Sequence, residues 1–365
     1  MRMVDAKIAI GDIETAVTIC IVIIEEMMEW AEYLSDGCDV AYEIIDNTIE
    51  QIREAIELAE INNESNAIFE IVYKHAMSDI YDDGSSWRVD LLSAIVPLCS
   101  IKANRDKIEQ YITSQRNTDN DLNVYEYQAL QELQYSILLM YENDSVAEEY
   151  LQQHLDNPEF RRIATENAML EKKYECVEQL CLEGERSCTD YGFILAFKEY
   201  RYNLYEKTMD VAKQTTLAIE LLLIGKKNYY HKLKELCNEH EWPEILNNIL
   251  AVLSEKDPGG IYLDIVLNEN LKSQLMDYCN GNIYLIKTYY PKLLPEYSAE
   301  IGEMFIAQIF ESEKRATSRS GYRNVCDWIK HYKKVSGNVA ANAIKKELLL
   351  RNARRRAFVD ELNKL

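Results

Sequence analysis

One segment of the sequence carries oxygen-bearing residues at the spacing of a calcium-binding loop. Asp79, Tyr81, Asp83, Gly84 and Asp90 occupy positions 1, 3, 5, 6 and 12 of the helix–loop–helix calcium template. Calcium takes a ring of oxygen ligands, and the glycine permits the sharp turn. A tyrosine at position 3 and a short aspartate at position 12 depart from the usual ligand set. We therefore expect a capped loop between helices, and keep Asp79, Asp83 and Asp90 as the alternative, a metal site.

Arginines near the end of the sequence form a second group with potential chemistry. Arg351, Arg354, Arg355 and Arg356 could neutralise phosphates and so contact a nucleic acid. Stacking aromatic residues are not interleaved with them, as single-strand binding surfaces usually require. The alternative is a solvated last helix whose cations complement its own C-terminal dipole. A nucleic-acid-associated accessory module acting through these arginines is therefore our second hypothesis for function.

Signatures of catalysis are absent from the sequence. There is no Gly-x-Ser-x-Gly nucleophile turn and no Gly-x-x-x-x-Gly-Lys-Ser/Thr phosphate loop. The five histidines are scattered, and carboxylates are so abundant that no pair of them is informative. We therefore predict a protein that is not an enzyme and takes no cofactor.

The charge of the chain is strongly negative and unevenly distributed. The net charge is −22, from 40 basic and 62 acidic residues. Residues 1–160 hold 33 acids and 9 bases, whereas residues 311–365 hold 14 bases and 6 acids. Such a field repels nucleic acid and anionic membranes, and its acidic half favours a basic protein partner. The basic end also suggests a head-to-tail contact between copies.

The cysteines and the apolar runs indicate a cytoplasmic protein. Nine cysteines, an odd number without paired spacing, are typical of free thiols in a reducing compartment. The first residues lack the pattern of a secretory signal. The longest apolar run, Ala16–Ile24, has nine residues and is too short to cross a membrane.

The elements that must position all these residues are helices. Ile45, Ile49, Ile52, Ile56 and Ala59 recur at alternating steps of four and three, which places them on one helical stripe. Only 12 glycines and 6 prolines occur, as expected for long helices with short connections. We predict helices over residues 12–34, 64–79, 86–99, 101–115, 122–141 and 145–155, and about eight more between Pro158 and Leu365.

Helices joined by short loops form antiparallel hairpins, and a single hairpin cannot bury its apolar face alone. We therefore predict an all-α solenoid, a right-handed superhelix of seven or eight tetratricopeptide-like hairpins. Its acidic half would be residues 1–157 and its second half, with the basic end, residues 158–365. One such hairpin is visible over residues 160–180, where Ala164 and Ala168 let the second helix approach closely. This architecture suits a non-catalytic scaffold for protein–protein interaction.

Three stretches of the sequence resemble the helical region that follows the finger in bacterial SWIM-type zinc finger proteins. These stretches are residues 68–92, residues 223–246 and residues 315–362, the last including Tyr322–Val325 and Arg354–Phe358. The resemblance implies degenerate tetratricopeptide-like repeats. The family's finger requires Cys-x-Cys followed by Cys-x-His, and neither occurs in this sequence. The resemblance therefore transfers no zinc ligands, and we expect either the helical part of a longer protein or a relative without the finger.

Overall fold

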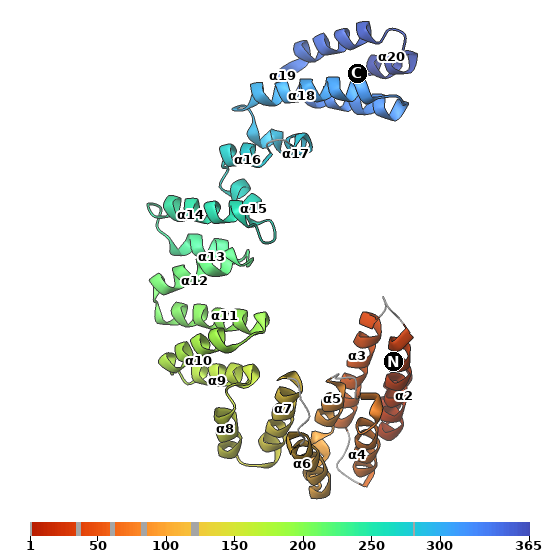
Figure 1. The fold of residues 1–365 in the computed structure, drawn as a ribbon, viewed down its shortest axis with the longest axis vertical. Coiled ribbons are helices and arrows are strands. Elements are labelled where there is room, and N and C mark those ends of the chain that lie inside the picture. The colour runs from red at the N-terminus through yellow and green to blue at the C-terminus, as the bar shows by residue number, and fades with distance from the viewer. Residues whose placement is uncertain (1, 34–37, 59–62, 82–85, 118–123, 280–281) are drawn as a thin grey trace. The chain divides into compact units, whose positions relative to one another are not determined.

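The computed structural model describes residues 2–33, 38–58, 63–81, 86–117, 124–279 and 282–365 (Figure 1). Every regular element in this part of the chain is a helix, which confirms the expected all-α class. The chain divides into two compact units, Met1–Leu204 and Tyr205–Leu365, and each is described by itself. The sequence analysis divided the chain between residues 157 and 158, where the acidic half ends. This position is the start of α9 (Pro158–Leu170), which lies inside the first unit.

The first unit contains ten complete α-helices, the greater part of an eleventh, and two short 3-10 helices within its described residues. They are α1 (Arg2–Ala9), α2 (Ile13–Tyr33), α3 (Cys38–Glu57), α4 (Asn63–Ala76), η1 (Asp79–Tyr81), α5 (Trp87–Ala94), η2 (Val96–Ser100), α6 (Lys102–Asn117), α7 (Val124–Tyr141), α8 (Asp144–Gln153), α9 (Pro158–Leu170), α10 (Tyr174–Ser187) and α11 (Tyr191–Thr208). Each helix predicted before Pro158 has a counterpart, but the one predicted over residues 86–99 ends at Ala94 and is followed by the separate 3-10 helix η2.

The isoleucine stripe of α3 lies in the core of the first unit. Ile45, Ile49, Ile52 and Ile56 are all at most 4% exposed, as the spacing predicted. Ala59, the last residue of that stripe, lies outside the described residues. The stripe packs with apolar residues of α2, α4 and α5, among them Ile24, Phe69 and Leu91. Removing these side chains from water supplies the main driving force for folding of this part of the chain.

The second unit continues with helices only. They are α12 (Val211–Leu223), α13 (Tyr229–Leu236), α14 (Trp242–Glu255), α15 (Ile261–Asn268), α16 (Lys272–Cys279), α17 (Ile283–Leu293), α18 (Ser298–Arg315), α19 (Arg319–Arg351) and α20 (Arg356–Asn363). From Pro158 onward the described residues form twelve α-helices, so the expectation of about eight was wrong. The reason is that α13, α15, α16 and α20 have eight residues each. Helices of about two turns are too short for a stripe to repeat along them.

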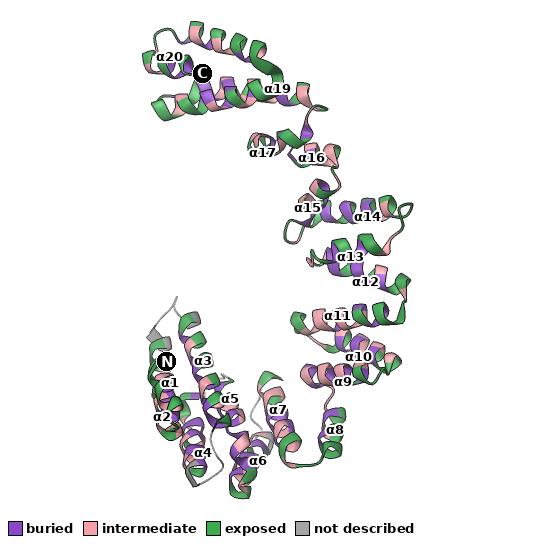
Figure 2. Cartoon of the chain, turned by 180° about the vertical axis from the view of Figure 1, so that it is seen from behind, coloured by how far each residue is buried: buried purple, intermediate pink, exposed green. Residues whose placement is uncertain are grey.

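Packing in both units joins helices that are close in sequence. The larger contacts between described α-helices all connect neighbours or next-but-one neighbours, such as α2 with α3, α9 with α10, α12 with α13 and α18 with α19. Buried positions consequently face the adjacent helix, while exposed positions line the other faces (Figure 2). Among the described helices, none combines the length and the apolar composition that crossing a membrane requires.

Gly337 reverses the direction of α19. Its backbone (φ 84°, ψ 173°) is not helical, and it separates residues 319–336 from residues 338–351. The second segment returns along the first. Evidence for this reversal is that the guanidinium of Arg355, just beyond α19, lies 5.0 Å from the ring of Tyr322, near its start. A straight helix would place these residues about 50 Å apart. Ser336-Gly337 is therefore a hairpin turn at a positive φ that glycine adopts freely.

Candidate partner-binding groove

Two asparagine caps set the direction of α8 and α9 in the first unit. The side chain of Asn143 accepts a hydrogen bond from the backbone N–H of Val146 (3.1 Å) at the start of α8. Asn157 does the same for the N–H of Glu159 (2.9 Å), and Pro158 follows at the first helical position. Both arrangements satisfy backbone donors that a helix start leaves without a partner. Asn157-Pro158 thus marks the N-terminus of α9.

The turn from α9 to α10 is a Schellman motif. The N–H of Lys173 donates to the carbonyl of Ala168 (2.9 Å), and the N–H of Lys172 donates to that of Met169 (3.2 Å). Lys172 itself has a φ of 59°. This geometry ends α9 sharply and starts α10 at once, so the two helices form the tight hairpin expected over residues 160–180. Ala164 and Ala168, each 4% exposed, lie where the helices approach.

A groove of about 570 Å³ lies over α8, α9 and α10. Its floor is apolar, since Ala164, Ala168 and Leu180 line it and are at most 7% exposed. Its rim carries the carboxylates of Asp144, Glu148 and Glu171 and one cation, Lys173.

The rim retains uncompensated negative charge. Lys173 forms an ion pair with Glu171 (2.5 Å), and this contact raises the pKa of the lysine. Among the described residues, no cation forms an ion pair within 4 Å of Asp144 or Glu148, although Lys173 attracts Glu148 at longer range. Glu148 accepts only a neutral hydrogen bond, from the side chain of Gln152 (2.8 Å). An apolar floor beneath two unpaired carboxylates is suited to an amphipathic, basic ligand.

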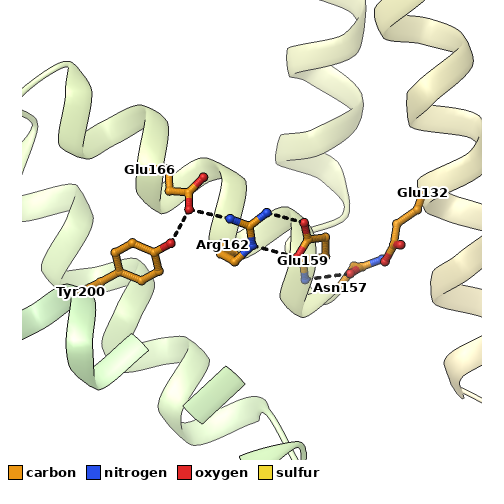
Figure 3. Close-up of polar contacts among 6 residues, drawn as sticks. All are labelled: Glu132, Asn157, Glu159, Arg162, Glu166 and Tyr200. Atoms are coloured by element: carbon orange, nitrogen blue, oxygen red, sulfur yellow. Dashed lines mark hydrogen bonds and ion pairs between the residues drawn. The ribbon is translucent and has the colours of Figure 1, made fainter. Parts of the chain in front are cut away.

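The opposite face of α9 is fixed by a polar network (Figure 3). Arg162 donates to both carboxylate oxygens of Glu159 (2.8 Å for the bond from Nε) and to Glu166 (2.5 Å). Glu166 also accepts a hydrogen bond from the phenol of Tyr200 on α11. Because the guanidinium donates two parallel hydrogen bonds to Glu159, this ion pair fixes the orientation of both side chains as well as their separation. Because Glu159, Arg162 and Glu166 all lie on α9, the hydrogen bond from Tyr200 is the contact of this network that joins α9 to α11.

Asn157 connects the same region to α7. Its amide nitrogen lies 3.2 Å from Oε1 of Gln131 and 3.3 Å from Oε1 of Glu132. Burial raises the pKa of Glu132, and the hydrogen bond from Asn157 opposes that shift. Asn157 and Gln131 are both buried, so these bonds satisfy groups that water does not reach.

One arrangement in the first unit has the residue types of a catalytic relay. Nδ1 of His75 lies 3.2 Å from a carboxylate oxygen of Glu25, and Nε2 lies 2.7 Å from the hydroxyl of Tyr81. Tyr81 is only 2% exposed, and burial raises the pKa of its hydroxyl. A phenol that is buried and protonated offers no nucleophile to a substrate. The relay instead ties α2, α4 and η1 together.

The calcium-loop candidates are only partly within the described residues. Asp83 and Gly84 lie outside them. Asp79 is exposed on η1, whereas Asp90 on α5 is half-buried and accepts a hydrogen bond from Ser86 (2.9 Å). Burial raises the pKa of Asp90. The described part of the chain shows no group of three or more potential metal ligands.

The four arginines predicted to contact nucleic acid have different surroundings. Arg355 donates to the carbonyls of Glu313 and Ala316, which end α18, and stacks on Tyr322 and Phe358. Arg351 pairs with Glu347 (3.2 Å) and lies over the ring of Phe310. Arg354 and Arg356 are exposed. The structure thus separates two arginines engaged within the fold from two that face solvent.

The rim carboxylates were not identified from the sequence. Asp144, Glu148 and Glu171 belong to an acidic half in which every exposed helix face carries similar residues. The signal that could have found them was the small-residue pair Ala164 and Ala168, because a close helix approach leaves a hollow beside it. Comparison with protein-family models, with curated proteins and with solved structures found no match for this chain.

Proposed function

We propose that this chain is a non-catalytic helical-repeat scaffold that binds a protein partner. The pattern of packing supports this proposal, because each helix packs against helices close to it in sequence, as in tetratricopeptide-like solenoids. The tight hairpin of α9 and α10, with small residues at its contact, fits the same class. The proposed relationship to the helical region of SWIM-type zinc finger proteins adds to it.

The groove over α8–α10 is the proposed binding site, and it carries the proposal. Its apolar floor would take aliphatic side chains, and Asp144 and Glu148 would pair with lysine or arginine. A helix with an aliphatic stripe flanked by basic residues meets both requirements. A cytoplasmic location agrees with the eight described cysteines, all of which are free thiols.

Binding of a synthetic amphipathic peptide tests the site. We would titrate the full chain with a labelled helical peptide of leucine and lysine, and with a counterpart in which glutamate replaces lysine. We expect the basic peptide to bind, and the double substitution Asp144→Lys with Glu148→Lys to weaken binding by at least about tenfold, since opposed charges become like charges. Asn167→Trp, which fills the groove from an exposed lining position, should also block the peptide.

A matched control removes the effect of net charge. Glu149→Lys with Asp156→Lys makes the same change in charge at exposed positions outside the groove lining. It should leave affinity within about threefold of the unmodified chain. Equal losses in both double variants would show that the peptide responds to overall charge, and the proposed site would then be wrong.

A further inference from the structure

The second segment of α19, residues 338–351, carries an exposed stripe. Val339 is 87% exposed and Leu350 is 82% exposed. Ala343 and Lys346 lie between them and are also exposed. The steps of four, three and four residues place all of these side chains on one face of the helix. We call Val339, Ala343, Lys346 and Leu350 the outer stripe.

The outer stripe is separate from the face that α19 uses inside its own unit. Ala341 and Leu348 are 4% and 0% exposed, so the inner face of the segment is already buried. Single exposed aliphatic residues are normal on protein surfaces. Val339 and Leu350 differ from such single residues in two ways. They are aligned on one face, and their helix already has a separate apolar face that is buried. Helices that are apolar on more than one face usually have a second partner.

The charge around the outer stripe is positive. Among the described residues, no carboxylate lies within 4 Å of Lys346, and Arg354 is exposed beyond the end of the helix. Glu347 is already paired with Arg351 (3.2 Å). The stripe therefore offers aliphatic side chains with free cations beside them. This is the chemistry that the groove over α8–α10 selects.

The outer stripe is slightly longer than the lined part of the groove. From Val339 to Leu350 the stripe extends about 16 Å along the helix. The groove lining extends about 12 Å along α8, from Asp144 to Gln152, and about 9 Å along α9, from Ala164 to Leu170. The stripe can therefore enter the groove over part of its length. Lys346 shares the face of Val339 and Leu350, so its ammonium reaches the rim carboxylates by extending past the apolar floor.

We propose that the outer stripe of one copy of this chain docks in the groove over α8–α10 of a second copy. The inference rests on the proposed function, because it uses the same groove and names its occupant. Each copy has one stripe and one groove, so the contact joins two different surfaces head to tail, in an open chain or a closed ring. Assembly then depends on protein concentration and, through the charged rim, on salt.

Sedimentation of the full chain at low and high salt tests the proposal. We expect assemblies that grow with concentration at low salt and dissociate as salt is raised. Leu350→Gln changes an exposed side chain and should shift the chain towards monomer, as should Lys346→Glu and Glu148→Lys individually. Lys330→Glu is the matched control, because Lys330 is exposed on α19 outside the stripe. It should assemble like the unmodified chain.

Mixing two defective variants gives the decisive result. The Lys346→Glu chain keeps the native groove, and the Glu148→Lys chain keeps the native stripe. In the mixture, the native stripe of one variant can dock in the native groove of the other. The two altered surfaces can also pair, because their charges are exchanged. Assembly should therefore return on mixing. A chain that stays monomeric at low salt, or assemblies unchanged by Leu350→Gln and by Glu148→Lys, would overturn the proposal. Groove-dependent binding of the leucine–lysine peptide by a monomeric chain would leave the proposed function standing.

Discussion

Gly184 on α10 lies directly against the ring of Phe197 on α11. A β-carbon at Gly184 would stand 2.6 Å from two carbons of that ring and 2.9 Å from Cδ of Arg161. Phe197 is fully buried, so the ring has little room to move away. Glycine is therefore required here for the close approach of two helices.

Gly184→Ala should destabilise the first unit by about 1–3 kcal/mol, the usual range for overpacking a close contact. Chemical denaturation followed by circular dichroism measures the change. Phe197→Leu alone should also destabilise, because it leaves a cavity. The double variant should cost less than the sum of the two single changes, since the smaller side chain makes space for the new methyl group. Strict additivity would show that the two residues are not in contact.

The sequence could predict those parts of the fold that depend on side-chain periodicity. Ile45, Ile49, Ile52 and Ile56 share one face of any helix, so their burial follows from spacing alone. Asn157 and Pro158 fix a helix start by local hydrogen bonding and ring geometry. The short helices of the second unit escaped prediction because two turns depend on packing against neighbours more than on their own pattern.

The groove could not be predicted from the sequence in the same way. Glu148 and Glu149 are adjacent, identical and both exposed, yet only Glu148 lines the groove. The packing of α9 and α10 beside α8 makes that distinction. The same holds for Arg354, Arg355 and Arg356, of which only the middle residue stacks on aromatic rings and reaches the carbonyls that end α18.

His75 should make the stability of the first unit depend on pH. Burial holds the pKa of His75 below its ordinary value of 6.5, although the nearby carboxylate of Glu25 opposes the shift. The unfolded chain therefore binds more protons at this residue than the folded chain does. The free energy of unfolding consequently rises with pH between the lowered pKa and the ordinary value, and falls as the solution is acidified through that interval.

Amide hydrogen exchange in α4, measured between about pH 5.5 and pH 7.5, should show this loss of protection after correction for intrinsic exchange. His75→Gln should flatten the dependence, since glutamine does not titrate. His331→Gln is the control, because burial also lowers the pKa of His331 but that residue belongs to the second unit. An α4 profile that is the same with and without His75 would contradict the assignment.

Asn157 should be among the least replaceable polar residues of the first unit. Asn157→Ala removes the cap of α9 and leaves the buried side chain of Gln131 and the half-buried side chain of Glu132 without this donor. We expect a loss of about 2–3 kcal/mol from the free energy of unfolding. Asn157→Asp keeps the cap but places a carboxylate beside Glu132, whose pKa burial already raises. Its defect should shrink as the solution is acidified, because one of the two neighbouring carboxylates then takes a proton.

Arg355 should matter for folding, whereas its two neighbours should not. Arg355→Ala removes the donors to the end of α18 and the stacking on Tyr322 and Phe358. It should lower the free energy of unfolding of the second unit by about 2 kcal/mol. Arg355→Lys should recover only part of this loss, because an ammonium cannot donate as a planar fork.

Arg354→Ser with Arg356→Ser changes two exposed arginines and should alter stability by at most about 0.5 kcal/mol. This double variant also tests the nucleic-acid hypothesis without disturbing the fold. Binding of single- and double-stranded DNA at low salt, measured by fluorescence anisotropy, should be weak in the unmodified chain and insensitive to the change. Strong binding that the double variant abolishes would instead favour the accessory-module hypothesis, since it would place phosphates on the two arginines that the fold leaves free.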